Sequence, residues 1–129
     1  MNVEAFLKAY KEPRNGTARF HFNHLYRRFK YSDGVKECAE AGCYWLLDIL
    51  GTELPGEFLA RPGEHMCLVT VDVFDHDNGP AALIRGEFVD DDPAPYTRSV
   101  DYTDLPVGEW KFVVTYDGDD WFCILLTEY

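Results

Sequence analysis

The stretch Asp33–Leu50, DGVKECAEAGCYWLLDIL, carries the strongest structural signal in this chain. Its apolar side chains recur every three or four residues, which places them on one side of an amphipathic helix. Gly42 lies inside this apolar stripe at a cost of about 1 kcal/mol relative to Ala, and indicates that a strand or another helix approaches closely. We expect this helix to be the central element of the fold.

The residues that flank the stretch predict where the helix begins and ends. Ser32 or Asp33 is suited to cap the first turn, because a side-chain oxygen can accept from an amide that lacks a partner there. Gly51 is suited to a left-handed terminal conformation, and Pro55–Gly56 follows as a stop signal. The predicted helix therefore covers about residues 33–50.

Outward from this helix, the apolar pattern predicts one more helix and four strands. Residues 2–11 have helical spacing and predict a short N-terminal amphipathic helix, whereas residues 19–31 give no clear assignment. Alternating apolar residues predict strands at about 66–74, 82–88, 110–116 and 121–126.

Together these elements predict an α+β fold. Turn-rich segments at 75–80 and 117–120 join the strands into two hairpins. We expect an antiparallel sheet of about four strands packed against the central helix, with a short N-terminal helix, in a single domain spanning residues 1–129.

Length and charge limit the classes of function. The chain has 129 residues with 23 Asp and Glu against 12 Lys and Arg, which gives a formal net charge of -11. This charge disfavours direct binding to nucleic acid or to an anionic membrane, and favours a basic protein partner. No secretory signal and no apolar run of roughly 20 residues is visible, so we expect a cytoplasmic protein with reduced cysteines.

The charge is distributed unevenly along the chain. Residues 1–36 carry eight basic and three acidic side chains, and the acidic excess lies in the remainder. Such asymmetry marks either a binding surface or a basic segment that packs beside the acidic loops of its own chain.

Carboxylates in turns and at strand ends are the candidate partner-binding residues. Alternate residues of a strand are about 6.7 Å apart, close to two phosphate steps along one DNA strand, so rows of Asp can imitate a phosphate backbone. The candidates are Asp75, Asp77, Asp90, Asp91, Asp92, Asp101, Asp104, Asp117, Asp119 and Asp120.

Candidates for catalysis or metal binding are weak. Cys43 precedes an aromatic pair as in papain-type proteases, but we expect it well inside the helix, without an N-terminal dipole to activate the thiol. His21 and His24 are three residues apart, and no second ligand pair at a conventional spacing accompanies them. We therefore assign no catalytic residue, no metal site and no cofactor.

Four segments carry a resemblance to a known family. They are YSDGVK at 31–36, YWLLD at 44–48, TDLPVG at 103–108 and TEY at 127–129. The chain resembles a small bacterial family of unknown function that occurs on plasmids, prophages and phages, and departs from its motifs mildly at Ser32 and Thr127. The resemblance implies a mobile genetic element as the setting and implies no activity.

The same motifs contain four polar side chains that are candidates for a functional role. They are Tyr31, Asp33, Asp48 and Glu128. A structural reading explains these positions as well: Asp33 starts the helix, and Asp48 lies off the apolar stripe, where a neighbouring strand or loop is within hydrogen-bonding reach.

Three hypotheses of function follow. The first is a non-enzymatic acidic accessory protein of a mobile element. It would inhibit a host defence complex of the CRISPR type by mimicking nucleic acid and binding in the basic groove that normally holds it. The second is a small cytosolic enzyme that uses Cys43 or a His/Asp group. The third is a homo-oligomeric regulatory module in which the basic segment of one copy binds the acidic surface of another.

Overall fold

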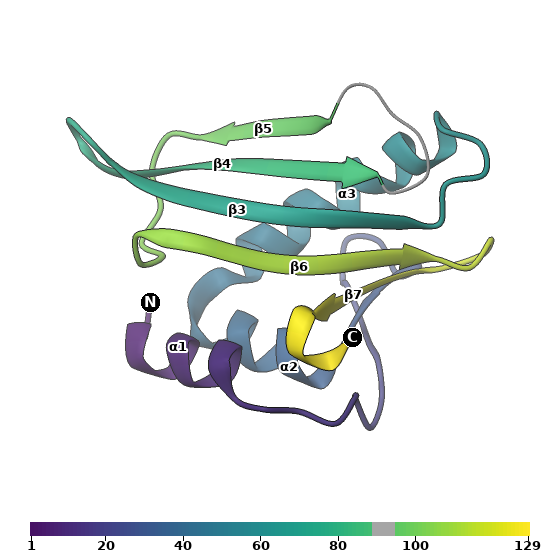
Figure 1. Cartoon of the computed structure of the whole chain (residues 1–129), viewed down its shortest axis with the longest axis horizontal. Coiled ribbons are helices and arrows are strands. Elements are labelled where there is room, and N and C mark those ends of the chain that lie inside the picture. Colours follow the sequence, from purple (N-terminus) through teal and green to yellow (C-terminus); the bar gives the residue numbers. More distant parts are fainter. Residues whose placement is uncertain (89–94) are drawn as a thin grey trace.

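The structure of the protein is a computed structural model that describes residues 1–88 and 95–129. Within them, seven strands form one mixed sheet in the order β1-β2-β7-β6-β3-β4-β5 (Figure 1). The strands are β1 His21–Phe22, β2 Phe29–Tyr31, β3 Met66–His76, β4 Gly79–Phe88, β5 Tyr96–Val100, β6 Gly108–Tyr116 and β7 Trp121–Leu125. The helical elements are α1 Val3–Lys11, α2 Asp33–Cys38, the π-helical η1 Ala39–Cys43, α3 Tyr44–Leu59 and the 3-10 turn η2 Leu126–Glu128.

The sheet corrects the expectation of about four antiparallel strands. Both predicted hairpins are present as β3–β4 and β6–β7, but β5 extends one edge, and β1 with β2 extends the other. β2 pairs with β7 in parallel, with Phe29 opposite Trp121, so the sheet is mixed. The prediction of a four-stranded antiparallel sheet is therefore wrong, although the fold remains α+β. β1 and β2 are two and three residues long, too short for an alternating pattern to reveal, and β5 has three consecutive exposed polar residues, so its side chains do not alternate between buried and exposed.

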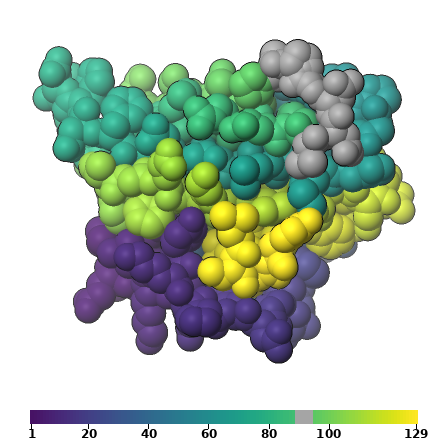
Figure 2. Space-filling model, viewed as in Figure 1, coloured from purple at the N-terminus to yellow at the C-terminus, as the bar shows by residue number. Residues whose placement is uncertain are grey.

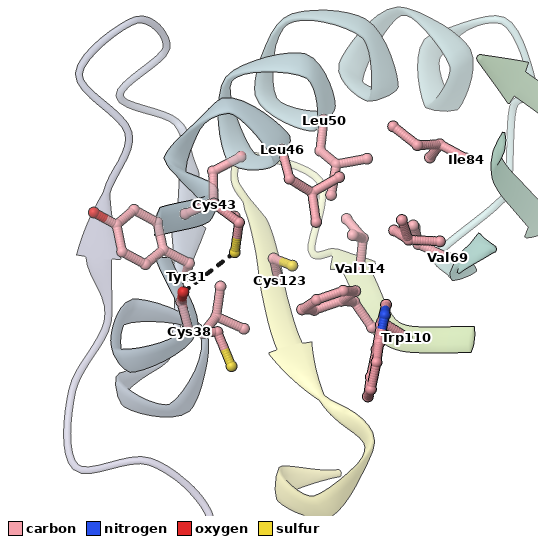
Figure 3. Packing of buried hydrophobic residues seen from close by; sticks show 14 of the residues in the cluster. Tyr31, Cys38, Cys43, Leu46, Leu50, Val69, Ile84, Trp110, Val114 and Cys123 are labelled. Carbon is pink, nitrogen blue, oxygen red and sulfur yellow. Dashed lines mark hydrogen bonds between the residues drawn. The ribbon is translucent and has the colours of Figure 1, made fainter. Parts of the chain in front are cut away.

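The three α-helices cover one face of this sheet. Buried side chains of β3 alternate along the strand and form one cluster with Leu46, Leu50 and Leu54 of α3. Figure 3 shows Leu46 and Leu50 on the side of the cluster opposite Val69. The inward side chains of β3 are Cys67, Val69, Val71 and Val73. The opposite face carries no helix in the described part of the chain. No helix of these residues is long and apolar enough to cross a membrane.

The central helix is interrupted, which corrects the expectation of one helix over 33–50. Gly42 adopts φ 133°, and the chain passes through η1 between α2 and α3. The segment that approaches Gly42 closely is the chain's own N-terminus. A Cβ at Gly42 would lie 3.0 Å from Met1 Cα, and the Asn2 amide donates to the Ala41 carbonyl at 2.8 Å.

The predicted end of the helix is also wrong. α3 continues through Gly51 and Pro55 to Leu59. The ring of Phe29 lies 3.3 Å from the position of a Cβ at Gly51, so this glycine permits close packing instead of ending the helix. Burial of Leu54 and Phe58 beyond it stabilises the added turns against their low helix propensity.

The N-terminal helix α1 closes an open stretch of strand edge. β7 pairs with β6 only from Phe112 onward, which leaves the amide of Lys111 without a strand partner. Tyr10 of α1 accepts from this amide at 2.9 Å, and Phe6 packs edge-on against Trp110 at 5.2 Å. Figure 2 shows the result as purple α1 and the yellow C-terminal segment lying side by side below β6.

Two glycines of the central helical region are predicted to respond in opposite directions to alanine. Gly42→Ala places a side chain at a positive φ and against Met1, and is expected to lower the free energy of unfolding by about 1–3 kcal/mol. Gly56→Ala, inside α3 with no atom within 4 Å of the new Cβ, is the matched control and is expected to raise it by up to about 1 kcal/mol. Urea unfolding measures both, and equal effects of the two substitutions would contradict the helix break.

Candidate functional site: the acidic hairpin end

The predicted partner-binding aspartates divide between two opposite ends of the sheet. β3 and β6 run antiparallel, so the β3–β4 hairpin and the β6–β7 hairpin lie at opposite ends of the strands (Figure 1). Asp75, Asp77, Asp101 and Asp104 lie at the first end, whereas Asp117, Asp119 and Asp120 lie at the second. Asp90, Asp91 and Asp92 lie outside the described residues. The candidates therefore do not form one continuous surface.

The aspartates of the β6–β7 hairpin are largely engaged within the chain. Asp117 accepts from the amides of Asp119 and Asp120, each at 2.8 Å, and these backbone bonds lower the pKa of its carboxyl group. Asp120 forms an ion pair with Lys30 at 2.8 Å and lies 3.6 Å from Arg28. This part of the basic segment thus packs beside an acidic loop of its own chain.

The other end of the sheet is more acidic than the predicted set suggested. We call it the acidic hairpin end and define it by Asp72, Asp75, Asp77, Asp101, Asp104 and Glu109. Sequence reasoning missed Asp72 and Glu109, which lie directly opposite each other on β3 and β6. The Thr103 amide donates to the Pro80 carbonyl at 2.9 Å and holds the β5–β6 loop against the hairpin.

These carboxylates have little compensation from cations. Asp104 pairs with the amino group of Met1 at 2.9 Å. Among residues 1–88 and 95–129, none of the other five carboxylates has a cation within 4 Å. Like charges opposite each other on neighbouring strands repel, so this end of the sheet gains most from an external positive charge.

A hollow of about 500 Å³ opens beside the same carboxylates. Phe74, Leu83 and Val100 contribute apolar walls, and Asp101 with His76 contributes polar groups. Phe74 is 40% exposed, and Tyr102 beside the hairpin is 64% exposed. The hollow is built by three strands, so no local sequence pattern could have revealed it. An apolar side chain next to a cationic group matches its lining.

The polar residues of the family-like motifs have structural roles. Glu128 accepts from the hydroxyl of Ser32, from the Gly34 amide at 3.0 Å and from the Leu125 amide at 2.9 Å. It therefore joins the end of β7 to the start of α2, where Ser32 caps the first turn as predicted. A Cβ at Gly34 would lie 2.8 Å from the Glu128 carboxyl group, which explains the glycine.

Asp33 and Asp48 anchor the loops around β1. Asp33 accepts from the Ala18 amide at 2.9 Å and contacts His21 at 2.9 Å, and these hydrogen bonds, the one to His21 above all, lower the pKa of the Asp33 carboxyl group to about 2. Asp48 accepts from the buried side chain of Asn23 at 3.2 Å, which confirms its expected contact with a neighbouring loop.

Tyr31 lies at the boundary between core and surface. Its ring is in the core, and its hydroxyl group points away from the core (Figure 3). Burial raises the pKa of this phenol, with a further contribution from nearby Tyr44.

The thiols are placed for packing. Cys43 is the last residue of η1 and the N-cap of α3, so it lies at the junction of two helical elements instead of well inside one helix. It is buried, and its thiol donates to the Cys38 carbonyl at 3.2 Å (Figure 3). Burial raises the pKa of Cys38, Cys43 and Cys67 to about 12, and also raises that of Cys123. A neutral thiol is a poor nucleophile, so the helix start does not activate Cys43.

The two histidines considered as metal ligands, His21 and His24, contact different carboxylates. His21 contacts Asp33, whereas His24 lies 3.9 Å from Asp48. Across the two described ranges, no group of three or more His, Cys, Asp or Glu side chains is arranged to hold a metal ion.

The hydrogen bonds of Asp33 predict a component of acid denaturation. Folding lowers the pKa of this carboxyl group from 3.8 to about 2, so its contribution to stability is complete above about pH 4 and is lost as the pH falls toward 2. We expect Asp33→Asn to reduce the loss of unfolding free energy between neutral pH and pH about 2. The control is Asp77→Asn in the exposed hairpin turn, and an unchanged pH profile for Asp33→Asn would contradict the assigned role.

Burial of the thiols predicts their reactivity. Iodoacetamide is expected to leave all four cysteines unmodified in the native protein and to alkylate all four in urea, as mass spectrometry would show. Rapid native modification of Cys43 would instead support a cysteine-dependent enzyme.

Comparisons with known proteins supply a family but no activity. Neither the curated proteins nor the solved structures contain a match to this chain. The sequence model of a family of unknown function (DUF6876) matches residues 7–129, nearly the whole chain. The protein therefore belongs to this family, DUF6876.

Proposed function

We propose that this protein is a non-enzymatic accessory protein that binds a basic surface of another protein through the acidic hairpin end. One observation carries the proposal: in the described part of the chain, five carboxylates without a cation within 4 Å share one end of the sheet with a hollow that has apolar walls and Asp101 in its lining, beside exposed aromatic rings. Polar rims around an aromatic or apolar centre are typical of protein interfaces.

Electrostatics and apolar burial have separate roles in this proposal. The net charge of -11 and the clustered carboxylates attract a basic partner and raise the rate of association, an effect that salt screens. Phe74 and Tyr102 supply the apolar area that holds the partner after contact, since aromatic residues at the centre of an interface carry much of the binding energy.

The basic surface that we propose as target is the nucleic-acid-binding groove of a host defence complex of the CRISPR type. The resemblance to proteins of mobile genetic elements motivates this choice, and DNA mimicry is the proposed mechanism. Asp75 lies near the end of β3 and Asp77 lies in the turn that follows, so both carboxylates are presented at the tip of the hairpin. The protein itself does not bind nucleic acid directly, and we place its action in the cytoplasm.

Charge reversal at the acidic hairpin end tests the proposal. Tagged wild-type protein, immobilised and exposed to bacterial lysate, is expected to retain nucleic-acid-binding proteins that high salt or added duplex DNA releases. The triple variant Asp75→Lys, Asp77→Lys and Asp101→Lys is expected to lose them. Quantitative mass spectrometry of the bound fraction measures the loss.

A second triple variant controls for total charge. Glu4→Lys, Glu40→Lys and Asp119→Lys change the net charge equally on exposed sites elsewhere, and this variant is expected to retain the partners. Equal retention by both variants would contradict the acidic hairpin end as the binding surface. Captured proteins that duplex DNA does not release would contradict the nucleic-acid groove as the target.

A further inference from the structure

A second surface of opposite character lies at the other edge of the sheet. We call it the basic–aromatic strip and define it by Arg19, Phe20, Phe22, Arg27, Lys30 and Phe122. Arg19 lines the same shallow hollow as Phe20 and Phe22. Arg27 lies over the ring of Phe22 at 4.4 Å, and Phe22 is opposite Lys30 in the sheet. Lys30 in turn lies 5.7 Å from the centre of the Phe122 ring, and Phe122 packs against Phe20 at 4.9 Å. These contacts make the strip continuous.

The strip is exposed and incompletely neutralised. Phe22 is 53% exposed and Phe20 is 42% exposed, which is unusual for neighbouring phenylalanines without a partner. Lys30 is paired with Asp120, but within residues 1–88 and 95–129 neither Arg27 nor Arg19 has a carboxylate within 4 Å. A protruding phenylalanine with a cation stacked on it is thus presented to a partner.

The strip and the hollow are complementary but cannot meet within one molecule. The strip lies on β1, β2 and β7, and the hollow lies on β3, β4 and β5, with β6 between the two groups of strands. The hollow offers apolar walls and the carboxylate of Asp101, with further carboxylates at the same end of the sheet, and the strip offers an apolar anchor and two arginines. Contact between them therefore requires a second copy of the chain.

We propose that the basic–aromatic strip of one copy binds in the acidic hairpin end of another, with Phe22 in the hollow and Arg27 and Arg19 facing Asp75, Asp77 and Asp101. This inference rests on the proposed function of the acidic hairpin end and names a further partner for it. The two surfaces differ, so the association is head-to-tail and continues beyond a dimer. Self-association also keeps the acidic hairpin end occupied until a stronger basic partner displaces the second copy.

A protein partner fits the strip better than a nucleic acid does. Asp120 already neutralises Lys30 and lies near Arg28. Affinity for nucleic acid depends on many cations that neutralise phosphates. Two arginines that have no carboxylate within 4 Å among the described residues, on a chain of charge -11, supply few.

Mixing two variants tests this inference. The strip variant carries Phe22→Ala and Arg27→Ala, and the end variant carries Asp75→Lys, Asp77→Lys and Asp101→Lys. In sedimentation velocity at low salt, the wild type is expected to form species larger than a dimer as its concentration rises, and high salt is expected to dissociate them. Each variant alone is expected to associate about tenfold or more weakly, because each lacks one of the two surfaces.

The mixture is the decisive sample. Each variant keeps the surface that the other lacks, so an equimolar mixture is expected to form a one-to-one dimer and nothing larger. A control variant with Leu59→Ala and Lys8→Ala, which removes an exposed apolar and a basic side chain elsewhere, is expected to associate like the wild type. Circular dichroism and thermal unfolding confirm that every variant is folded.

Three results would overturn the inference. In the first, the wild type stays monomeric at every concentration. In the second, the mixture forms no dimer. In the third, a labelled single-stranded oligonucleotide binds through the strip while the protein does not self-associate. If the mixture stays monomeric while capture of lysate proteins still depends on Asp75, Asp77 and Asp101, this inference fails and the proposed function stands.

Discussion

The long antiparallel pairing of β3 with β6 is the constraint on which the rest of this structure depends. Its register sets Cys67 opposite Val114, Val69 opposite Phe112 and Val71 opposite Trp110, so that apolar side chains of both strands share one face. Burial of that face against α3 supplies the main driving force of folding. The same pairing places the acidic β3–β4 and β6–β7 turns at opposite ends, where they meet different environments.

The two ends show how one kind of residue acquires two roles. At the β6–β7 hairpin, carboxylates close the turn and bind basic side chains of the same chain. At the β3–β4 hairpin end, equally acidic residues lie at the same end of the sheet as a hollow, and within the described residues five of them have no cation within 4 Å. Composition alone cannot distinguish these roles, because the cations that neutralise the first group come from residues about 90 positions away along the sequence.

Much of the secondary structure follows from the sequence, and less of the topology does. The helical spacing before Leu50 and the alternation in β3, β4, β6 and β7 locate the core elements correctly. The break at Gly42 escaped prediction because it depends on Met1 and Asn2, and Gly51 and Pro55 stay helical because tertiary packing outweighs local preference. Strands β1 and β2 are too short to carry a pattern, and β5 lacks the alternation because its three central residues are all exposed. Of the candidate site, the aspartates of the β3–β4 hairpin could be named, but the hollow, Phe74 and Tyr102 needed the fold.

Hydrogen exchange of the free protein and of its complex with a partner captured at low salt tests the central claim most directly. Amides of residues 72–83 and 99–104 are predicted to exchange more slowly in the complex, because these segments form the acidic hairpin end. Unchanged exchange in both segments, with protection confined to α1 and α2, would show that the partner binds elsewhere and would contradict the account.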